Sequence, residues 1–187
     1  RSFYAQSTST VARALIGKVL VRREGKHTLA GRIVETEAYL GPGDRASHAS
    51  QARRPEAAIM NGPPGVAYVF RVYSLHFCLN AVTEPEGRAG AVLLRALEPL
   101  RGTERMQRDR KRRLPATKIA SGPGRLCRAF AITDEWNGGA LSGKDLWIED
   151  DGSPAPDIAC GPRIGVEYAG TWAAKPLRFW EADSPFV

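Results

Sequence analysis

The segment VAYVFRVYSLHFCLNAV, residues 66–82, decides the fold class of this chain. Residues 66–73 and 76–82 are both rich in β-branched and aromatic side chains, and only Ser74 and Leu75 separate the two runs. Two such runs so close together predict antiparallel strands joined as a β-hairpin. Ser-Leu is not a favoured turn sequence, so the hairpin prediction depends on the strands and not on the turn.

Strand patterns also lie on both sides of this segment. They predict further strands at residues 18–23, 28–39, 91–97, 146–149, 163–168 and 176–180. Strands predominate and helices do not alternate with them, which predicts a mixed α+β fold with a mainly antiparallel sheet. No internal repeat or low-complexity linker divides the sequence, so we expect one domain over residues 1–187.

Short helices are expected to flank the sheet. Thr8 or Ser9 can cap one helix, and Ser121 can cap another. Residues 101–113 are helix-compatible and very basic, so they either follow a phosphate backbone or form a solvated helix face. Residues 40–65 have the glycine and proline content of a long loop, which inside a compact domain is usually functional or mobile.

Charge and composition suit an anionic partner. Lysine and arginine number 27 against 20 acidic residues, which gives a formal charge of +7. Nucleic acid is the commonest partner of a basic domain, and improved solubility is the alternative explanation. The three cysteines are far apart without a C-x-x-C pair, and the three histidines have no metal-ligand spacing. We therefore expect neither a disulfide framework nor a bound metal.

Several features bear on the location of the protein. No apolar run approaches the roughly 18 residues needed to span a bilayer, and the first residues do not resemble a signal peptide. Because the sequence opens at Arg1, we expect that a preceding segment has been trimmed. The expectation is an intracellular protein without membrane contact. An Ala- and Arg-rich composition favours the bacterial cytoplasm (nucleoid), with the nucleus as the location if the source is eukaryotic.

Two acidic residues form a candidate catalytic pair. Glu35 and Glu37 stand two apart in the expected strand 28–39, so both side chains leave one face, about 6.5–7 Å apart. An inverting glycosidase places its acid and base at such a separation. Solvated surface carboxylates are the alternative, which the spacing alone favours. Tyr39 follows on the same face and sets an aromatic ring beside the carboxylates.

The predicted hairpin interleaves aromatic and basic residues. Alternation places Tyr68 and Phe70 on one face, and Arg71 and Tyr73 on the other. Such residues can stack bases and contact phosphates, whereas simple core packing is the alternative for Tyr68 and Phe70. Tyr73 stands at the expected tip, where a large aromatic side chain suits insertion between bases. Taken alone, these residues indicate a basic α+β domain with a carboxylate near aromatic rings.

Five segments of the chain resemble the alkyladenine DNA glycosylase family, also called the N-methylpurine or 3-methyladenine DNA glycosylase family. They are GRIVETEAYLGPGD (31–44), YVFRVYSLHFCLN (68–80), VLLRALEPL (92–100), SGPGRLC (121–127) and KPLRF (175–179). The segments follow the order of the family and extend over nearly the whole chain. The resemblance implies a curved sheet with a protruding β-hairpin, similar to the formyltransferase C-terminal-domain-like barrel. It also implies a monomer that needs no cofactor.

The resemblance implies roles for the residues of a base pocket. Glu37 matches the catalytic general base of the family. Tyr39, His48 and Phe70 match three residues that stack against a flipped base. Well-known relatives have tyrosine at the position of Phe70, so this chain keeps the ring and lacks the hydroxyl, which puts its substrate preference in doubt. The main chain around Ala46 is expected to hydrogen-bond the purine edge.

The resemblance also implies roles in DNA contact and selectivity. Tyr73 matches the residue that fills the gap left in the duplex, and Asn80 matches the residue that obstructs the 2-amino group of normal guanine. Arg95 matches an arginine beside the pocket that helps to hold the DNA backbone. His76 stands near the phosphate backbone at a position where relatives often have tyrosine. The loop 53–61 differs from the family, so we assign no contacts there.

The activity implied is that of a monofunctional DNA glycosylase in base-excision repair. It flips an alkylated or deaminated purine from double-stranded DNA and hydrolyses the N-glycosidic bond with a Glu37-activated water, leaving an abasic site. One alternative is a non-catalytic nucleic-acid-binding module of the same fold. Another is an enzyme that acts on free nucleosides or small glycosides through Glu35 and Glu37.

Overall fold

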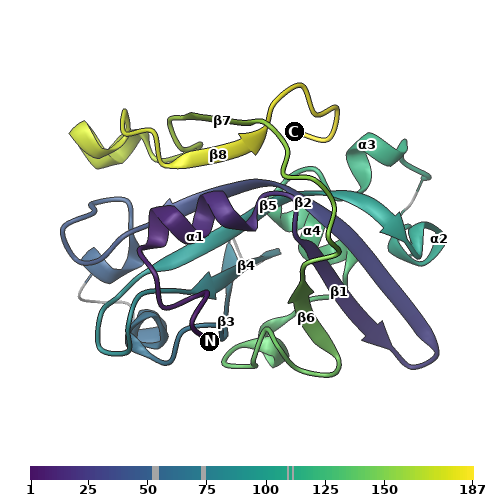
Figure 1. Cartoon of the computed structure of the whole chain (residues 1–187), viewed down its shortest axis with the longest axis horizontal. Coiled ribbons are helices and arrows are strands. Elements are labelled where there is room, and N and C mark those ends of the chain that lie inside the picture. Colours follow the sequence, from purple (N-terminus) through teal and green to yellow (C-terminus); the bar gives the residue numbers. More distant parts are fainter. Residues whose placement is uncertain (52–54, 73–74, 109, 111) are drawn as a thin grey trace.

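A bent antiparallel sheet organises the chain (Figure 1). The computed structural model describes residues 1–51, 55–72, 75–108, 110 and 112–187. Within them eight strands run in the order β3-β4-β5-β2-β1-β6, and β7 joins through β8, which pairs with β2. The strands are β1 (Val19–Glu24), β2 (His27–Tyr39), β3 (Ala67–Val72), β4 (His76–Val82), β5 (Ala91–Arg101), β6 (Leu146–Glu149), β7 (Ile158–Gly161) and β8 (Arg178–Glu181). The fold is α+β with a curved antiparallel half-barrel, as the sequence predicted.

The curvature arises along β2, the central strand. This strand has 13 residues and pairs with β5 along most of its length, with register shifts around Gly31 and Glu35. Extra residues of this kind bend a strand and increase its twist. On its other edge β2 pairs first with β1 and then with β8. The sheet therefore divides at β2, with β1 beside its first half and β8 beside its second half. The second half of β2 is buried.

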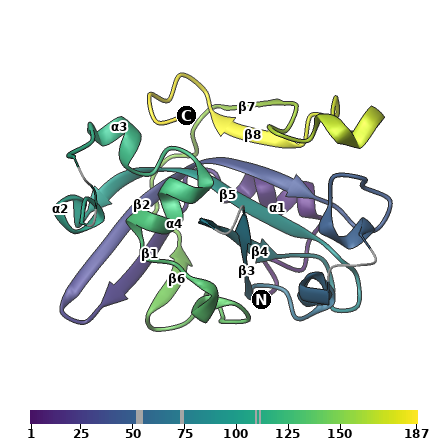
Figure 2. The same ribbon diagram turned by 180° about the vertical axis from the view of Figure 1, so that it is seen from behind.

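The helices are short and cover the sheet. They are α1 (Thr8–Leu15), α2 (Thr103–Met106), α3 (Ala116–Ile119) and α4 (Pro123–Ala129), with 3-10 helices η1 (His48–Ser50), η2 (Pro55–Asn61), η3 (Asp134–Trp136) and η4 (Glu167–Trp172). Figures 1 and 2 show α1 against one face of the β2–β5 region and α4 against the other. No helix in the described part of the chain has both the length and the apolar character needed to cross a membrane.

Local capping and packing explain the position of α1. The helix is capped by Ser7, and not by Thr8 or Ser9 as predicted: the Ser7 side chain accepts a hydrogen bond from the Thr10 N–H at 3.3 Å, which satisfies one free donor of the first turn. Val11 and Leu15, four residues apart, are fully buried in the main core. On the same side, the Thr36 hydroxyl of β2 donates to the Ala12 carbonyl at 2.9 Å. Because side chains alternate along a strand, Glu35 and Glu37 point to the opposite face.

Two of the predicted elements are wrong. Residues 101–113 are not one helix: among the described residues of this range only α2 is helical, and Gln107 lies beside Leu114. The Gln107 side chain clamps the main chain of Leu114 through two hydrogen bonds of 2.8 Å. Residues 163–168 are not a strand either. They leave the sheet after β7 and enter η4, because the Arg163 side chain is drawn into the interior and Gly165 adopts a φ of 75°.

Candidate active site

A cavity of about 420 Å³ lies where the second half of β2 meets β3, β4 and the segment before η4. This volume falls within the roughly 300–1,000 Å³ typical of small-molecule sites. Its lining combines aromatic rings, small apolar groups and a few polar side chains. The lining residues are Tyr39, Ala46, His48, Met60, Tyr68, Phe70, Arg71, Val72, Cys78, Asn80, Ala91, Leu93, Arg95, Pro123, Gly165, Val166 and Tyr168.

The structure brings most of the predicted site residues to this cavity. Those that line it are Tyr39, Ala46, His48, Phe70, Asn80 and Arg95. Glu37 lies directly behind the wall and hydrogen-bonds to two of the lining residues. His76 is exposed on β4, lies beside Gly124 of α4 and is not among the residues that line the cavity. Tyr73 lies outside the described residues.

Aromatic rings from two distant segments form one wall. His48, at the start of η1, and Phe70, on β3, have ring centroids 4.5 Å apart in an edge-to-face arrangement. The buried Tyr68 lies beside them, with its ring centroid 5.2 Å from that of Phe70. Its hydroxyl group forms a 2.8 Å hydrogen bond with Nδ1 of His48. Tyr68 and Phe70 therefore share a face, as alternation predicted, and that face lines the cavity.

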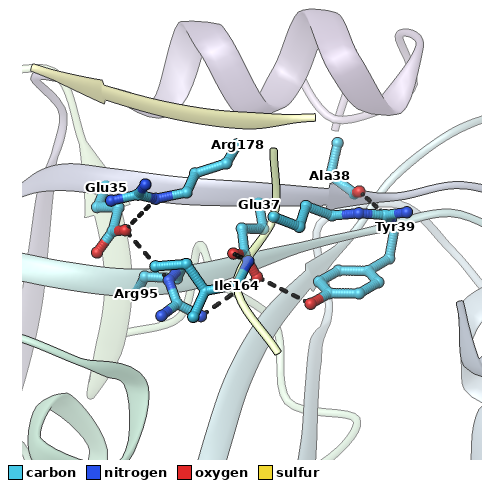
Figure 3. Close-up of polar contacts among 8 residues, drawn as sticks. Glu35, Glu37, Ala38, Tyr39, Arg95, Ile164 and Arg178 are labelled. Carbon is cyan, nitrogen blue, oxygen red and sulfur yellow. Dashed lines mark hydrogen bonds and ion pairs between the residues drawn. The ribbon is translucent and has the colours of Figure 1, made fainter. Parts of the chain in front are cut away.

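Glu37 is completely buried and receives three hydrogen bonds (Figure 3). The Tyr39 hydroxyl and Nη1 of Arg95 donate to its Oε2 at 2.8 and 3.2 Å. The Ile164 N–H donates to its Oε1 at 2.7 Å. Burial raises the pKa of Glu37, and the positive charge of Arg95 and the donors at Ile164 and Tyr39 offset only part of that rise. The carboxylate is thus held in a fixed direction, under the wall formed by Tyr39 and Arg95.

Glu35 lies beside Glu37 on the same face of β2, as the two-residue spacing predicted. Its Oε1 accepts hydrogen bonds from Nε of Arg95 at 3.2 Å and Nε of Arg178 at 2.5 Å. Arg95 therefore bridges the two carboxylates. Glu35 does not line the cavity, and its described partners are both arginines, so the geometry gives little support to a Glu35–Glu37 acid–base pair.

The polar groups of the cavity floor are already engaged with the protein. The Asn80 side chain is buried and donates through Nδ2 to the Tyr68 carbonyl at 3.0 Å. The Ala46 N–H donates to Oδ1 of Asp44 at 3.0 Å. A hydrogen bond to a purine edge near Ala46 must therefore come from main-chain groups other than this N–H. Among the described residues, no group of three or more His, Cys, Asp and Glu side chains is placed to hold a metal ion.

Sequence reasoning missed the wall formed by residues 163–168 and the ion pair that anchors it. Arg163 and Asp44 are both fully buried, and they form two hydrogen bonds of 2.6 and 2.8 Å. Because the sequence predicted a strand at residues 163–168, it gave no indication that the charged side chain of Arg163 would be buried. Gly161 and Gly165, on either side of Arg163, were the available signal for a chain reversal.

Comparisons with known proteins agree with one another. A family model described as Methylpurine-DNA glycosylase (MPG) matches residues 2–185. A protein of Anaeromyxobacter dehalogenans (strain 2CP-1 / ATCC BAA-258) is 53% identical over 188 residues, which cover all of this chain and 83% of that protein. Proteins of Myxococcus xanthus (strain DK1622) and Legionella pneumophila (strain Corby) are 46% and 42% identical over 188 residues, covering all of this chain and 91% and 96% of theirs. All three carry the name "Putative 3-methyladenine DNA glycosylase".

Proposed function

Because the chain belongs to the methylpurine-DNA glycosylase family, we propose that it flips alkylated or deaminated purines out of double-stranded DNA and hydrolyses their N-glycosidic bonds. One observation carries this proposal: a cavity of small-molecule size is walled by aromatic rings and lies directly beside a buried glutamate. Rings of Tyr39, His48 and Phe70 offer stacking surfaces, and Glu37 offers a base behind them.

Flipping is required because C1′ of a nucleotide is inaccessible inside a stacked duplex. Extruding the nucleotide costs a few kcal/mol, and least for a damaged or mispaired base. We assign to Tyr73 the insertion that offsets part of this cost. Its structure is outside the described residues, and support comes from its position in the sequence between β3 and β4, next to two strands that line the cavity.

The aromatic cavity favours alkylated purines in two ways. A purine nucleotide alkylated at N3 or N7 carries positive charge, so its base is attracted to the ring faces of Tyr39 and Phe70. The same charge makes the base a better leaving group. A neutral lesion such as hypoxanthine needs a proton on the leaving base, and its excision is expected to be slower.

In the proposed chemistry, ionised Glu37 takes a proton from a water that attacks C1′ while the bond to the base breaks. The negative charge also stabilises the cationic character that the sugar develops. In the structure, Arg95 and Tyr39, which both line the cavity, donate to Oε2 of Glu37. A water that enters at this point replaces one of these donors and is held between Glu37 and Arg95.

The product is an intact strand with an abasic site. Since water is the nucleophile, no lysine Schiff base forms, so the enzyme is monofunctional and lacks lyase activity. We further propose that residues 1–187 act as a single glycosylase domain and as a monomer, without a cofactor. Superposition on a formyltransferase C-terminal domain would test the expected likeness of the half-barrel. We propose that the protein acts inside the cell, where its proposed DNA substrate is found.

Glu37→Gln tests the assignment. The variant keeps the size of the side chain and removes the base, so we expect release of the lesion to fall by about 10²–10⁴-fold. The measurement is single-turnover excision from duplexes that each carry one lesion, read as strand cleavage after alkali. Excision at the wild-type rate would refute the role of Glu37.

Glu35→Gln is the matched control. It makes the same chemical change two residues away, on the same face of β2. Because Glu35 is bound to Arg95 and Arg178 and does not line the cavity, its loss is expected to slow excision far less than the loss of Glu37. Equal losses, with activity on free nucleosides, would favour the small-glycoside enzyme. Binding of duplex without any base release by the wild type would favour the non-catalytic module.

A further inference from the structure

A buried charge pair outside the proposed catalytic group connects three parts of the cavity wall. Nη1 and Nη2 of Arg163 donate to the two carboxylate oxygens of Asp44 at 2.6 and 2.8 Å. The two residues are 119 positions apart in the sequence, and neither side chain is exposed. Removing two charges from water costs more than a simple pair usually returns, so apolar residues would serve packing alone at least as well. The pair therefore calls for an explanation beyond stability.

Arg163 also contacts β2, the strand whose Tyr39 side chain lines the cavity. Its Nη1 also donates to the Ala38 carbonyl of β2 at 2.8 Å, and its guanidinium lies over the Tyr39 ring, 4.8 Å from the centroid. The next residue, Ile164, donates its N–H to Glu37. Arg163 thus contacts both the proposed stacking residue and the residue before it in β2. Its place in the chain also sets the path of Ile164, the donor that orients the proposed base.

Asp44 extends the connection to the third wall. One carboxylate oxygen accepts from the Leu40 N–H and the other from the Ala46 N–H, both at 3.0 Å. The loop that leads to His48 is therefore folded around Asp44, and Arg163 fixes that fold to β2. Burial alone would raise the pKa of Asp44, but Arg163 and these two main-chain donors hold it below its usual range.

We propose that Arg163 is a positioning residue for base excision, which fixes the spacing of the cavity walls and the direction of the Glu37 carboxylate. It contacts neither the base nor the sugar. Its planar guanidinium makes two parallel bonds to Asp44 while it stacks on Tyr39, and a lysine ammonium cannot do both. This inference rests on the proposed glycosylase function, since it concerns the geometry of that reaction.

Arg163→Lys is the informative variant, because it keeps the buried positive charge opposite Asp44. Misplacement of a reacting group by about 1 Å costs about 100-fold in rate, so we expect single-turnover excision from a hypoxanthine duplex to fall by about that factor. Binding of undamaged duplex is expected to stay within about threefold of wild type, since that affinity comes from phosphate contacts.

A pH profile separates positioning from loss of structure. In the wild type, the Ile164 N–H stabilises the ionised form of Glu37, together with Arg95 and the Tyr39 hydroxyl, while Glu35 opposes it. If Arg163→Lys displaces Ile164, the acid limb of the excision profile should move to higher pH. A variant that is merely less stable would keep the wild-type limb.

Arg22→Lys is the matched control. Arg22 also donates to main-chain carbonyls, those of Phe130 and Ala131, and also stacks on an aromatic ring, that of Trp136, at 4.8 Å. In Arg22 and Arg163 alike, Nε is buried without a hydrogen-bond partner among the described residues. Arg22 does not line or border the cavity. Both variants should lower the Tm, and only Arg163→Lys should slow excision at a temperature where both are folded.

Asp44→Asn/Arg163→Met removes both charges and so avoids an unpaired buried carboxylate. We expect it to recover thermal stability relative to Arg163→Met alone and to remain slow in excision. Excision within about threefold of wild type by a folded double variant or by Arg163→Lys would overturn the inference while leaving the function intact. A wild type that releases no base from any lesion duplex would instead overturn the proposed function, and this inference with it.

Discussion

Glu37 combines full burial with a role, in the proposed reaction, that needs its charged form. Burial raises its pKa above the ordinary value of 4.5, so folding favours the protonated carboxyl. The sign of the linkage follows: this group's contribution to stability is fully present below the ordinary value and is lost as the pH rises through the folded pKa. Holding Glu37 as the carboxylate that the proposed reaction uses therefore costs stability, as is common for groups at functional sites.

As the pH is lowered, the rate of excision should begin to fall at a higher pH than it would if the base were an exposed glutamate. In the proposed mechanism the rate needs ionised Glu37, so it should drop about tenfold per pH unit below the raised pKa. Tyr39→Phe keeps the ring and removes a donor to Oε2, which should raise the pKa further and move the acid limb to higher pH. The measurement is the pH profile of single-turnover excision, and a limb that stays in place or moves to lower pH would contradict this account.

At the residue scale, sequence reasoning succeeded where the relation is local. The two-residue spacing of Glu35 and Glu37 placed both on one face, and alternation placed Tyr68 and Phe70 together. It failed for Asp44 and Arg163, since their pairing spans 119 positions and depends on a chain reversal that no periodicity encodes. Nor does spacing reveal that Arg95 bridges the two glutamates.

At the scale of elements, strands were easier to predict than helices. Strand residues carry their burial pattern within a few positions, so β6 was predicted with its observed bounds and the β3–β4 hairpin is confirmed. The basic segment 101–113 has helix-forming residues, but contacts from outside it decide its path. Arg105 and Arg108 both bind Glu24 of β1, which draws the segment against the sheet.

Helix α1 depends on a carboxylate from the loop after β4. Oε1 of Glu84 accepts from the Thr8 N–H at 2.7 Å and from the Thr8 hydroxyl at 2.9 Å. Glu84→Ala leaves this buried N–H without its partner, so we expect the free energy of unfolding to fall by about 1–3 kcal/mol. Urea unfolding followed by circular dichroism measures the change.

Glu86→Ala is the control for that prediction. Glu86 is an exposed neighbour in the same loop, and its loss should change stability by less than about 0.5 kcal/mol. Because α1 packs on the face of β2 opposite Glu37, Glu84→Ala should leave excision unchanged at low temperature. Equal unfolding midpoints for the two variants would show that the Glu84 bonds do not stabilise α1.

At the scale of the whole molecule, the net charge of +7 should make DNA binding sensitive to salt. Contact with about six phosphates would lower affinity roughly 10³-fold between 50 and 200 mM salt, because binding releases counterions. Fluorescence anisotropy with an undamaged duplex measures the dependence. A flat response would contradict a binding surface built on phosphate contacts.

Arg105→Gln provides a control for this prediction. The Arg105 side chain is paired with Glu24, so its removal should leave the salt dependence as it is in the wild type. A shallower dependence would mean that Arg105 exchanges its carboxylate partner for a phosphate when DNA binds.

The pairing of β2 with β8 has a consequence during synthesis. Arg178, which binds Glu35, follows it by 143 positions, and Ile164, which orients Glu37, follows that residue by 127. A ribosome therefore exposes the β2 carboxylates long before it delivers the groups that hold them. Until then Glu37 lacks the donor that orients it, so we expect a nascent chain to be unable to carry out the proposed hydrolysis before its last strand has been synthesised.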